Sequence, residues 1–340
     1  YTVMRTRILT GVTPSGVPHL GNYVGAIRPA ITASQSKQND SFFFLSDYHA
    51  LIKCKDAALV EQSTKAVTAA WLAAGLDYEK VIFYRQSDVP EVLELNWILT
   101  TCCAKGLMNR AHAYKAAVQE NIDKGLPTSE EDHAIEMGLY CYPILMAADI
   151  LMMNADYVPV GKDQIQHLEM TRDIASRFNH RYGKLFTLPK ARVDENVPLL
   201  NGLDGRKMSK SYGNTIPLFA PEEKLRQAIM KIVTNSQAPG EPKLAEDSNL
   251  YAIYTAFANQ KECQQIKEDL LDGLSWGEAK QRVFTIINQQ LSPKREIYQQ
   301  LLSTPKKMEE ILQYGAEKAR YIARPLLLQV KKAVGLSPVG

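Results

Sequence analysis

The chain has 340 residues, of which 45% are hydrophobic and 23% charged, and its formal net charge is +3 at pH 7. That length allows one large core or two domains, and a charge of this size does not by itself indicate a nucleic-acid partner. No apolar run has the roughly 20 residues that a membrane-spanning helix needs and the N-terminus lacks the layout of a signal peptide, so we expect a cytoplasmic protein with no membrane partner.

The first two hundred residues alternate short apolar runs with longer segments of helical spacing. The apolar runs predict strands at residues 7–12, 41–45, 81–85 and 157–160. Alternation of this kind is typical of βαβ units around a parallel sheet. We therefore expect an α/β fold, with a doubly wound, Rossmann-like parallel-sheet domain over residues 1–205.

After Pro217 the strand signals stop and helical spacing continues. The predicted helices lie at residues 221–235, 246–258, 260–272, 277–290 and 294–312, with a last helix from about Ala316. Pro325 is expected to kink or restart that helix. From Lys294 to the end there are nine basic and four acidic residues, a pattern typical of a surface for a polyanion or of a solvated helix face. We expect an all-helical domain over residues 216–340, whose last helix packs back on the first domain.

Two short polar motifs predict a phosphate site. Residues 18–22 read Pro-His-Leu-Gly-Asn after a predicted strand, a position where backbone N–H groups at a helix start receive phosphate. His19 and Asn22 can donate to phosphate oxygens, and Gly21 allows a close approach. Residues 207–211 read Lys-Met-Ser-Lys-Ser on a glycine-flanked loop, where two cations could close over polyphosphate. The chain has no G-x-G motif and no G-x-x-x-x-G-K-[ST] loop to compete with them.

A third feature is a lone carboxylate in an apolar helical run. Asp149 is surrounded in sequence by Leu, Met, Ile and Ala, and a charge buried in such a setting needs a donor. Tyr142, Met146 and Asp149 fall at i, i+4 and i+7, and so share a helix face. They could line an apolar pocket that also binds one N–H group. The alternatives are an acid turned to solvent or one paired with a core arginine.

The same stretch carries a family resemblance. Residues 138–182 resemble tryptophanyl-tRNA synthetases in Tyr-Pro at 142–143, Met-Ala-Ala-Asp-Ile-Leu at 146–151, Val-Pro-Val-Gly at 158–161, Asp-Gln at 163–164 and Gln-His-Leu-Glu at 166–169. Residues 10–16, 21–26 and 46–50 also resemble the corresponding motifs of tryptophanyl-tRNA synthetases. The two phosphate motifs resemble the paired signatures of class I aminoacyl-tRNA synthetases, and the resemblance covers nearly the whole chain.

This resemblance implies activation of L-tryptophan by ATP and its transfer to tRNA(Trp). The catalytic set that it implies is His19, Asn22, Lys207 and Lys210. ATP is expected to lie among Thr13, Pro14, Ser15, Gly21, Asn22, Gly161, Lys162, Asp163, Leu199, Lys207, Met208, Ser209, Lys210 and Ser211. Tryptophan is expected to lie among His49, Tyr142, Met146, Asp149, Val158, Val160 and Gln164, with Asp149 accepting the indole N–H. Residues 206–215 are expected to form the mobile loop between the catalytic domain and a tRNA-recognition domain.

The family also implies a homodimer, and Mg²⁺ that arrives with ATP. We expect no protein-bound metal, because the five cysteines lack the spacing of an iron–sulfur or zinc site. Three departures stand out: Thr13 replaces a glutamine found in many bacterial members, Lys162 replaces an acid, and residues 104–136 form a long helical insertion that could be a lid or part of a subunit interface.

Two alternatives stay open. A tyrosyl-tRNA synthetase would share the fold, although residues 146–148 offer no polar partner for a phenol. An RNA-binding paralogue without aminoacylation would not need Asn22, Gln164, Lys207 and Lys210 together.

Overall fold

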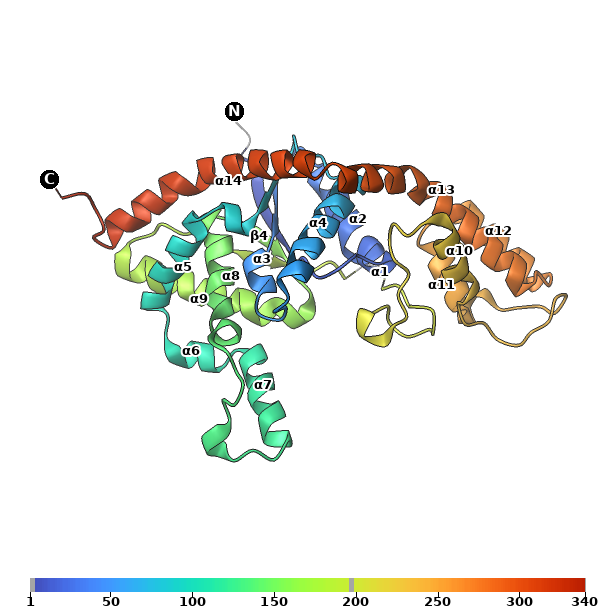
Figure 1. Cartoon of the computed structure of the whole chain (residues 1–340), viewed down its shortest axis with the longest axis horizontal. Coiled ribbons are helices and arrows are strands. Elements are labelled where there is room, and N and C mark those ends of the chain that lie inside the picture. Colours follow the sequence, from blue (N-terminus) through green and yellow to red (C-terminus); the bar gives the residue numbers. More distant parts are fainter. Residues whose placement is uncertain (1–3, 196–198, 340) are drawn as a thin grey trace.

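The protein is described by a computed structural model that covers residues 4–195 and 199–339 (Figure 1). At its centre is a five-stranded parallel sheet in the order β3-β2-β1-β4-β5. Its strands are β1 (Thr6–Val12), β2 (Asn39–Leu45), β3 (Ile82–Arg85), β4 (Tyr157–Pro159) and β5 (Lys190–Arg192). The four strands predicted from apolar runs are confirmed. The sequence did not predict β5, because its three residues begin and end with exposed basic side chains.

Helices cover both faces of the sheet. Up to β5 the helices and helical turns are α1 (Leu20–Asn22), η1 (Tyr23–Ile27), α2 (Arg28–Ser34), α3 (Asp47–Ala50), α4 (Ala57–Ala73), η2 (Gln86–Asp88), α5 (Glu91–Cys102), α6 (Lys105–Asn109), α7 (His112–Asp123), η3 (Thr128–Glu130), α8 (Met137–Met152), η4 (Lys162–Gln164) and α9 (Ile165–Tyr182). Successive side chains of β2 enter two different cores. Phe43 and Leu45 pack in the core that includes α4, whereas Phe42 and Phe44 pack with α5, α8 and α9. This confirms the doubly wound, Rossmann-like α/β class.

After β5 the described chain is helical between its loops. Its elements are η5 (Lys210–Tyr212), α10 (Glu222–Met230), η6 (Ala245–Asp247), α11 (Asn249–Thr255), α12 (Gln260–Leu271), α13 (Trp276–Ser303) and α14 (Pro305–Ala333). The predicted helical character is confirmed. Within the described ranges, no helix is both long and apolar enough to span a membrane.

Two helix boundaries predicted from the sequence are wrong. Residues 277–290 and most of 294–312 belong to one helix, α13, and the break comes at Thr304. Pro305 then occupies the first turn of α14, where its missing N–H costs nothing. Pro325 does not restart α14, because Ala323 and Leu327 are buried on either side of it and hold the helix against the core.

The helix α14 covers the edge strand β3 of the sheet. A Cβ added to Gly315 would lie 1.6 Å from the backbone oxygen of Phe83, so helix and strand meet backbone to backbone. Figure 1 shows α14 as the long red helix that runs along the α/β domain to the C-terminus. Because the helix covers it, β3 is not left open to pair with a strand of another molecule. The expectation that the last helix packs back on the first domain agrees with these contacts.

Most of the basic residues near the C-terminus have partners within the chain, and four of them hold α14 in place. Lys318 donates to the backbone oxygen of Val81 at 2.6 Å, and Arg320 is paired with the buried carboxylate of Glu91 at 2.9 Å. Six of the nine have partners of this kind, namely Lys294, Arg295, Lys318, Arg320, Arg324 and Lys331. These partners fix where six of the nine cations lie, and the interpretation of the run as a surface for a polyanion stays a prediction.

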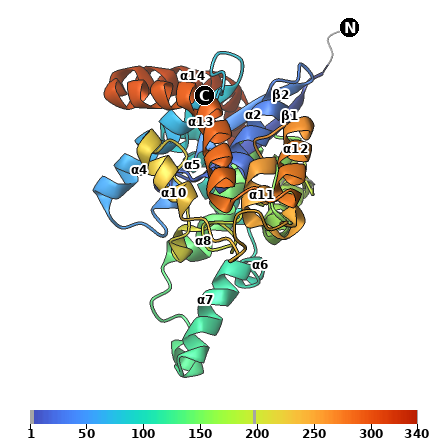
Figure 2. The same ribbon diagram turned by 90° about the vertical axis from the view of Figure 1, so that its right-hand side faces the viewer.

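Residues 104–136 form an arm that projects from the α/β domain, as Figures 1 and 2 both show. The amide of Asn121 on α7 donates to the backbone oxygens of Glu131 and His133 at 2.8 Å each, which fixes the returning loop. At the base of the arm, the side-chain oxygen of Gln166 accepts from the N–H of His112 at 2.9 Å. A role of this arm as a lid or a subunit interface stays a prediction.

Candidate active site

The carboxyl ends of four parallel strands meet at one edge of the sheet. There β1 continues into residues 13–16, β2 into residues 46–49, β3 into Gln86 and β4 into residues 160–164. Open parallel sheets of this kind bind ligands at the carboxyl ends of their strands. Most residues predicted to bind ATP or tryptophan lie on these four segments or pack against them.

The histidine motif forms a helix cap. Asn22 donates its N–H to Nδ1 of His19 at 3.2 Å, and His19 donates its N–H to Oδ1 of Asn22 at 3.0 Å. Burial, together with the nearby cation of Lys210, lowers the pKa of His19 to about 4, so the ring is neutral at pH 7. Because Nδ1 accepts, the proton of the neutral ring lies on Nε2, which can donate to an anion. The amide nitrogen of Asn22 takes no part in this cap.

Glycine at position 21 is required by the cap itself. A Cβ at Gly21 would lie 2.9 Å from the ring of His19 and 3.3 Å from Cβ of Met208. The sequence attributed this glycine to the close approach of a nucleotide. The structure gives a further reason, because the ring of His19 and the loop of residues 207–211 both pack against this position.

Backbone hydrogen bonds bring the two distant phosphate motifs together. The N–H of Leu20 donates to the backbone oxygen of Ile216 at 2.8 Å, and the N–H of Leu218 donates to that of Pro18 at 3.0 Å. These bonds place the segment after residues 207–211 against the start of α1. The sequence predicted that the two motifs act together, and these contacts bring them together.

Side chains of residues 207–211, the lysine loop, also contact the histidine motif and the turn after β1. The N–H of Gly21 donates to the sulfur of Met208 at 3.3 Å, and Met208 is buried. The ammonium group of Lys210 donates to the backbone oxygen of Ser15, and burial lowers the pKa of this lysine. Lys207 is exposed. One lysine therefore rests on the turn after β1, while the other faces solvent.

A residue that the sequence analysis missed holds this loop in shape. Asn214 is 2% exposed; its Oδ1 accepts from the N–H of Ser209 at 2.9 Å, and its Nδ2 donates to the backbone oxygen of Lys207 at 3.1 Å. The only local signal is its position after Gly213, which has a positive φ of 62°.

Asp149 lies at the centre of a buried polar cluster. Its side chain accepts from Nε2 of Gln86 at 2.9 Å on each oxygen, and His49 Nε2 lies 3.0 Å from Oδ2. Asp149 is 1% exposed, and this burial raises the pKa of its carboxyl group. The alternatives of an acid turned to solvent or paired with a core arginine are therefore wrong. Gln86 was not predicted, and its only sequence signal is its place directly after a strand.

A chain of rings extends from this cluster along α8. The hydroxyl group of Tyr142 lies 2.6 Å from Nε2 of His167, and the rings of His49 and Tyr142 meet edge to face with their centroids 6.0 Å apart. Burial lowers the pKa of His167. The other residues predicted to bind tryptophan differ in their exposure. Val158 and Val160 are buried, Met146 is half-buried and Gln164 is exposed.

The other predicted ATP residues lie on loops after β1 and β4. The hydroxyl group of Ser46 donates to Oγ1 of Thr13 at 3.3 Å, which connects the turns after β1 and β2. Lys162 pairs with Glu195 at 3.8 Å, and both side chains are about three-quarters exposed. Leu199 is 74% exposed. The residues on these loops and on residues 207–211 that are predicted to bind ATP and are exposed are Thr13, Ser15, Gly161, Lys162, Asp163, Leu199, Lys207, Lys210 and Ser211.

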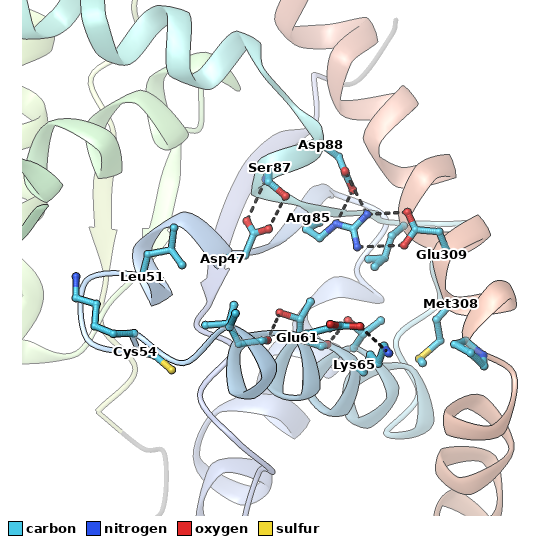
Figure 3. A pocket seen from close by; sticks show the side chains of 17 residues that line it. Asp47, Leu51, Cys54, Glu61, Lys65, Arg85, Ser87, Asp88, Met308 and Glu309 are labelled. Atoms are coloured by element: carbon cyan, nitrogen blue, oxygen red, sulfur yellow. Dashed lines mark hydrogen bonds and ion pairs between the residues drawn. The ribbon is translucent and has the colours of Figure 1, made fainter.

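A cavity of about 740 Å³ lies elsewhere, between α3, α4 and the start of α14 (Figure 3). Its lining contains none of the residues predicted to bind ATP or tryptophan. Every charged side chain that the structure describes in its lining has a partner, such as Arg85 with Asp88 at 2.9 Å and with Glu309 at 2.7 Å. With its charges already paired, this cavity is a weaker candidate for the substrates than the edge of the sheet.

Comparisons with known proteins agree with this geometry. Residues 3–292 match the model of the family described as tRNA synthetases class I (W and Y). The chain is 59% identical over 335 residues to a tryptophan–tRNA ligase of Neisseria meningitidis, covering 98% of this chain and 99% of the relative. It is 57% identical to a tryptophan–tRNA ligase of Pseudomonas aeruginosa, covering 98% and 74% respectively.

A solved structure agrees in fold as well as in sequence. The tryptophanyl-tRNA synthetase of Campylobacter jejuni, crystallised with ADP and tryptophan, superposes with a TM-score of 0.89 at 41% identity over 97% of this chain and 100% of its own. The chain therefore belongs to the class I tRNA synthetases for tryptophan and tyrosine, and within them to the bacterial tryptophanyl-tRNA synthetases.

Proposed function

We propose that the chain activates L-tryptophan with Mg²⁺-ATP and transfers it to tRNA(Trp), with both substrates bound along the carboxyl edge of the sheet. The observation that carries the proposal is the meeting of three distant segments at this edge. They are the capped histidine motif, the lysine loop that packs on it, and the buried cluster around Asp149. In this proposal a site for an anionic nucleotide lies next to a site with one buried acceptor.

In this proposal Asp149 accepts the indole N–H of tryptophan. Met146, Val158 and Val160 supply the apolar walls around the ring, while Tyr142 and Gln164 hold the α-ammonium group with His49 nearby. A buried acceptor that the wrong amino acid leaves unpaired discriminates more steeply than apolar fit does. The burial of Asp149, which is 1% exposed, supports this role.

ATP is proposed to lie on the loops after β1 and β4 and under the lysine loop. Nε2 of His19 and the amide nitrogen of Asn22 donate to its phosphate oxygens, and Asp163 accepts from the ribose hydroxyl groups. Lys207 and Lys210 neutralise the charge that develops on pyrophosphate as it leaves. The other residues around the nucleotide are Thr13, Pro14, Ser15, Gly21, Gly161, Lys162, Leu199, Met208, Ser209 and Ser211.

The first reaction is attack of a carboxylate oxygen of tryptophan on the α-phosphorus of ATP. The bond from that phosphorus to the bridging oxygen breaks, and pyrophosphate leaves. In the second reaction a hydroxyl group of the terminal ribose of the tRNA attacks the carbonyl carbon, and AMP leaves. The carboxylate needs no general base, so catalysis depends on positioning and on electrostatic stabilisation. Mg²⁺ arrives with ATP and offsets the charge of its phosphates.

The remaining proposals concern partners and location. The helices of residues 216–340 recognise the tRNA, the active protein is a homodimer, and it works in the cytoplasm. An apolar face on α5 supports the homodimer, because Trp97 is 68% exposed and Leu93, one turn before it, is 37% exposed. Light scattering of the purified protein tests the dimer, and a single-chain mass would refute it.

The test of the function is ATP–pyrophosphate exchange, with each amino acid offered in turn to the wild type and to Asp149→Asn. We expect exchange with tryptophan alone, and a loss of at least about 100-fold in kcat/KM in the variant. The matched control is Asp156→Asn, which changes a carboxylate that accepts from the N–H of Arg7 at 2.8 Å, where β1 and β4 begin.

Three outcomes would contradict the proposal. Exchange with tyrosine would favour the tyrosyl alternative and remove the role given to Asp149. Exchange that Asp149→Asn leaves unchanged would place the indole elsewhere. No exchange with any amino acid would favour the RNA-binding paralogue.

A further inference from the structure

Gln86 is a fully buried amide whose three hydrogen bonds fix its orientation. Its Nε2 donates to both oxygens of Asp149 at 2.9 Å, and its Oε1 accepts from the N–H of Tyr48 at 3.0 Å. The side chain is 0% exposed. A flipped amide would turn its oxygen towards a carboxylate and its nitrogen towards an N–H group, so only one orientation is compatible with its surroundings.

The donors around Asp149 are distributed unequally between its two oxygens. Oδ2 accepts a hydrogen bond from Nε2 of Gln86 and also faces Nε2 of His49. Within the described residues, Oδ1 accepts a hydrogen bond only from Gln86. A carboxylate oxygen offers two lone-pair directions. Oδ1 therefore keeps one direction for a further donor, and the amide of Gln86 determines where that direction points.

The residues on either side of Gln86 in the chain, Arg85 and Ser87, are held by ion pairs and hydrogen bonds (Figure 3). The carboxylate of Asp47 accepts from the N–H of Ser87 at 3.0 Å and from its hydroxyl group. Arg85 connects Asp88 to Glu309 of α14. Side chains that position a functional group need such a support, because small displacements weaken the contact that they organise.

We propose that Gln86 is a positioning residue for amino-acid selection, which holds the carboxylate of Asp149 so that Oδ1 presents a fixed acceptor to the substrate N–H. This inference rests on the proposed role of Asp149. A merely structural role for Gln86 would be to satisfy a buried carboxylate, and it would affect all substrates equally. The positioning role instead affects substrates that carry the ring N–H.

The test compares tryptophan with β-(3-benzothienyl)alanine, an analogue of similar shape in which sulfur replaces the ring N–H. The measurement is kcat and KM for each in ATP–pyrophosphate exchange, with wild type, Gln86→Met and Asp149→Asn. Methionine keeps the length of the side chain and removes its hydrogen bonds. We expect Gln86→Met to reduce the preference for tryptophan over the analogue by about 10- to 100-fold, through KM for tryptophan, with kcat little changed.

Two further variants complete the design. Gln290→Met makes the same change in α13, where the amide donates to the backbone oxygen of Phe257, and it is expected to keep the wild-type preference. Gln86→Leu also removes the N–H donor and brings no second acid beside Asp149, so it provides the same test if Gln86→Met does not fold. It is also expected to reduce the preference.

The outcomes separate this inference from the proposed function. If Asp149→Asn loses the preference while both Gln86 variants keep it, the inference is wrong and the role of Asp149 stands. If the Gln86 variants lower kcat/KM equally for both substrates, Gln86 is structural and the inference is again wrong. If Asp149→Asn keeps the preference, the role of Asp149 fails and the inference fails with it.

Discussion

Replacing Gly315 with alanine tests the packing of α14 on the edge of the sheet. The new Cβ would lie 1.6 Å from the backbone oxygen of Phe83 and 2.5 Å from its carbonyl carbon. Carbon atoms pack at about 3.5 Å or more, so the helix has to move by more than 1 Å. A flexible side chain could turn aside, but the backbone of a strand cannot.

The cost can be estimated from three contributions. Overpacking costs about 1–3 kcal/mol, and the upper end applies because backbone meets backbone. A displaced helix also weakens the hydrogen bond of Lys318 to Val81 and the pair of Arg320 with Glu91, by about 1 kcal/mol each. Alanine regains about 1 kcal/mol in helix propensity. We therefore expect a net loss of about 2–4 kcal/mol in the free energy of unfolding.

The assay is urea unfolding followed by far-ultraviolet circular dichroism, with Gly277→Ala as the matched control. Gly277 lies in the first turn of α13, and an added Cβ meets no atom within 4 Å, so this variant is expected to be at least as stable as the wild type. Equal stability of Gly315→Ala and Gly277→Ala would show that α14 does not pack on β3 as closely as the structure indicates.

Three further predictions address the cap, the lysine loop and the fastening of α14. Because the pKa of His19 is lowered from 6.5 to about 4, the unfolded chain binds the proton more readily than the folded chain between these pH values. The free energy of unfolding is therefore expected to fall as the pH drops from 6.5 to about 4. Urea titrations at several pH values measure this fall, and His19→Gln is expected to make it smaller. Lys210→Ala is expected to slow ATP–pyrophosphate exchange about 100-fold with calorimetric tryptophan binding unchanged, and weakened binding would argue against its role at pyrophosphate. Glu91→Gln removes the carboxylate that Arg320 and Arg324 share and is expected to cost about 2 kcal/mol of unfolding free energy, so unchanged stability in urea would refute this fastening.

Local patterns in the sequence determined most of the fold class and part of the site. Apolar runs located four of the five strands, because strand burial is visible in the side chains themselves. The histidine motif and the lysine loop were predictable for a similar reason, since a glycine turn and two cations are local features. The apolar neighbours of Asp149 also predicted its need for a donor.

Only the tertiary structure decided which groups meet across the chain. Gln86 reaches Asp149 from 63 residues away, and nothing in its own neighbourhood indicates this contact. The strand β5 exists because β4 offers it hydrogen bonds, although its own residues have no apolar pattern. A charge count cannot distinguish a cation that faces RNA from one paired with Glu91, because the strength of a pair depends on distance and burial, and only the folded chain sets these.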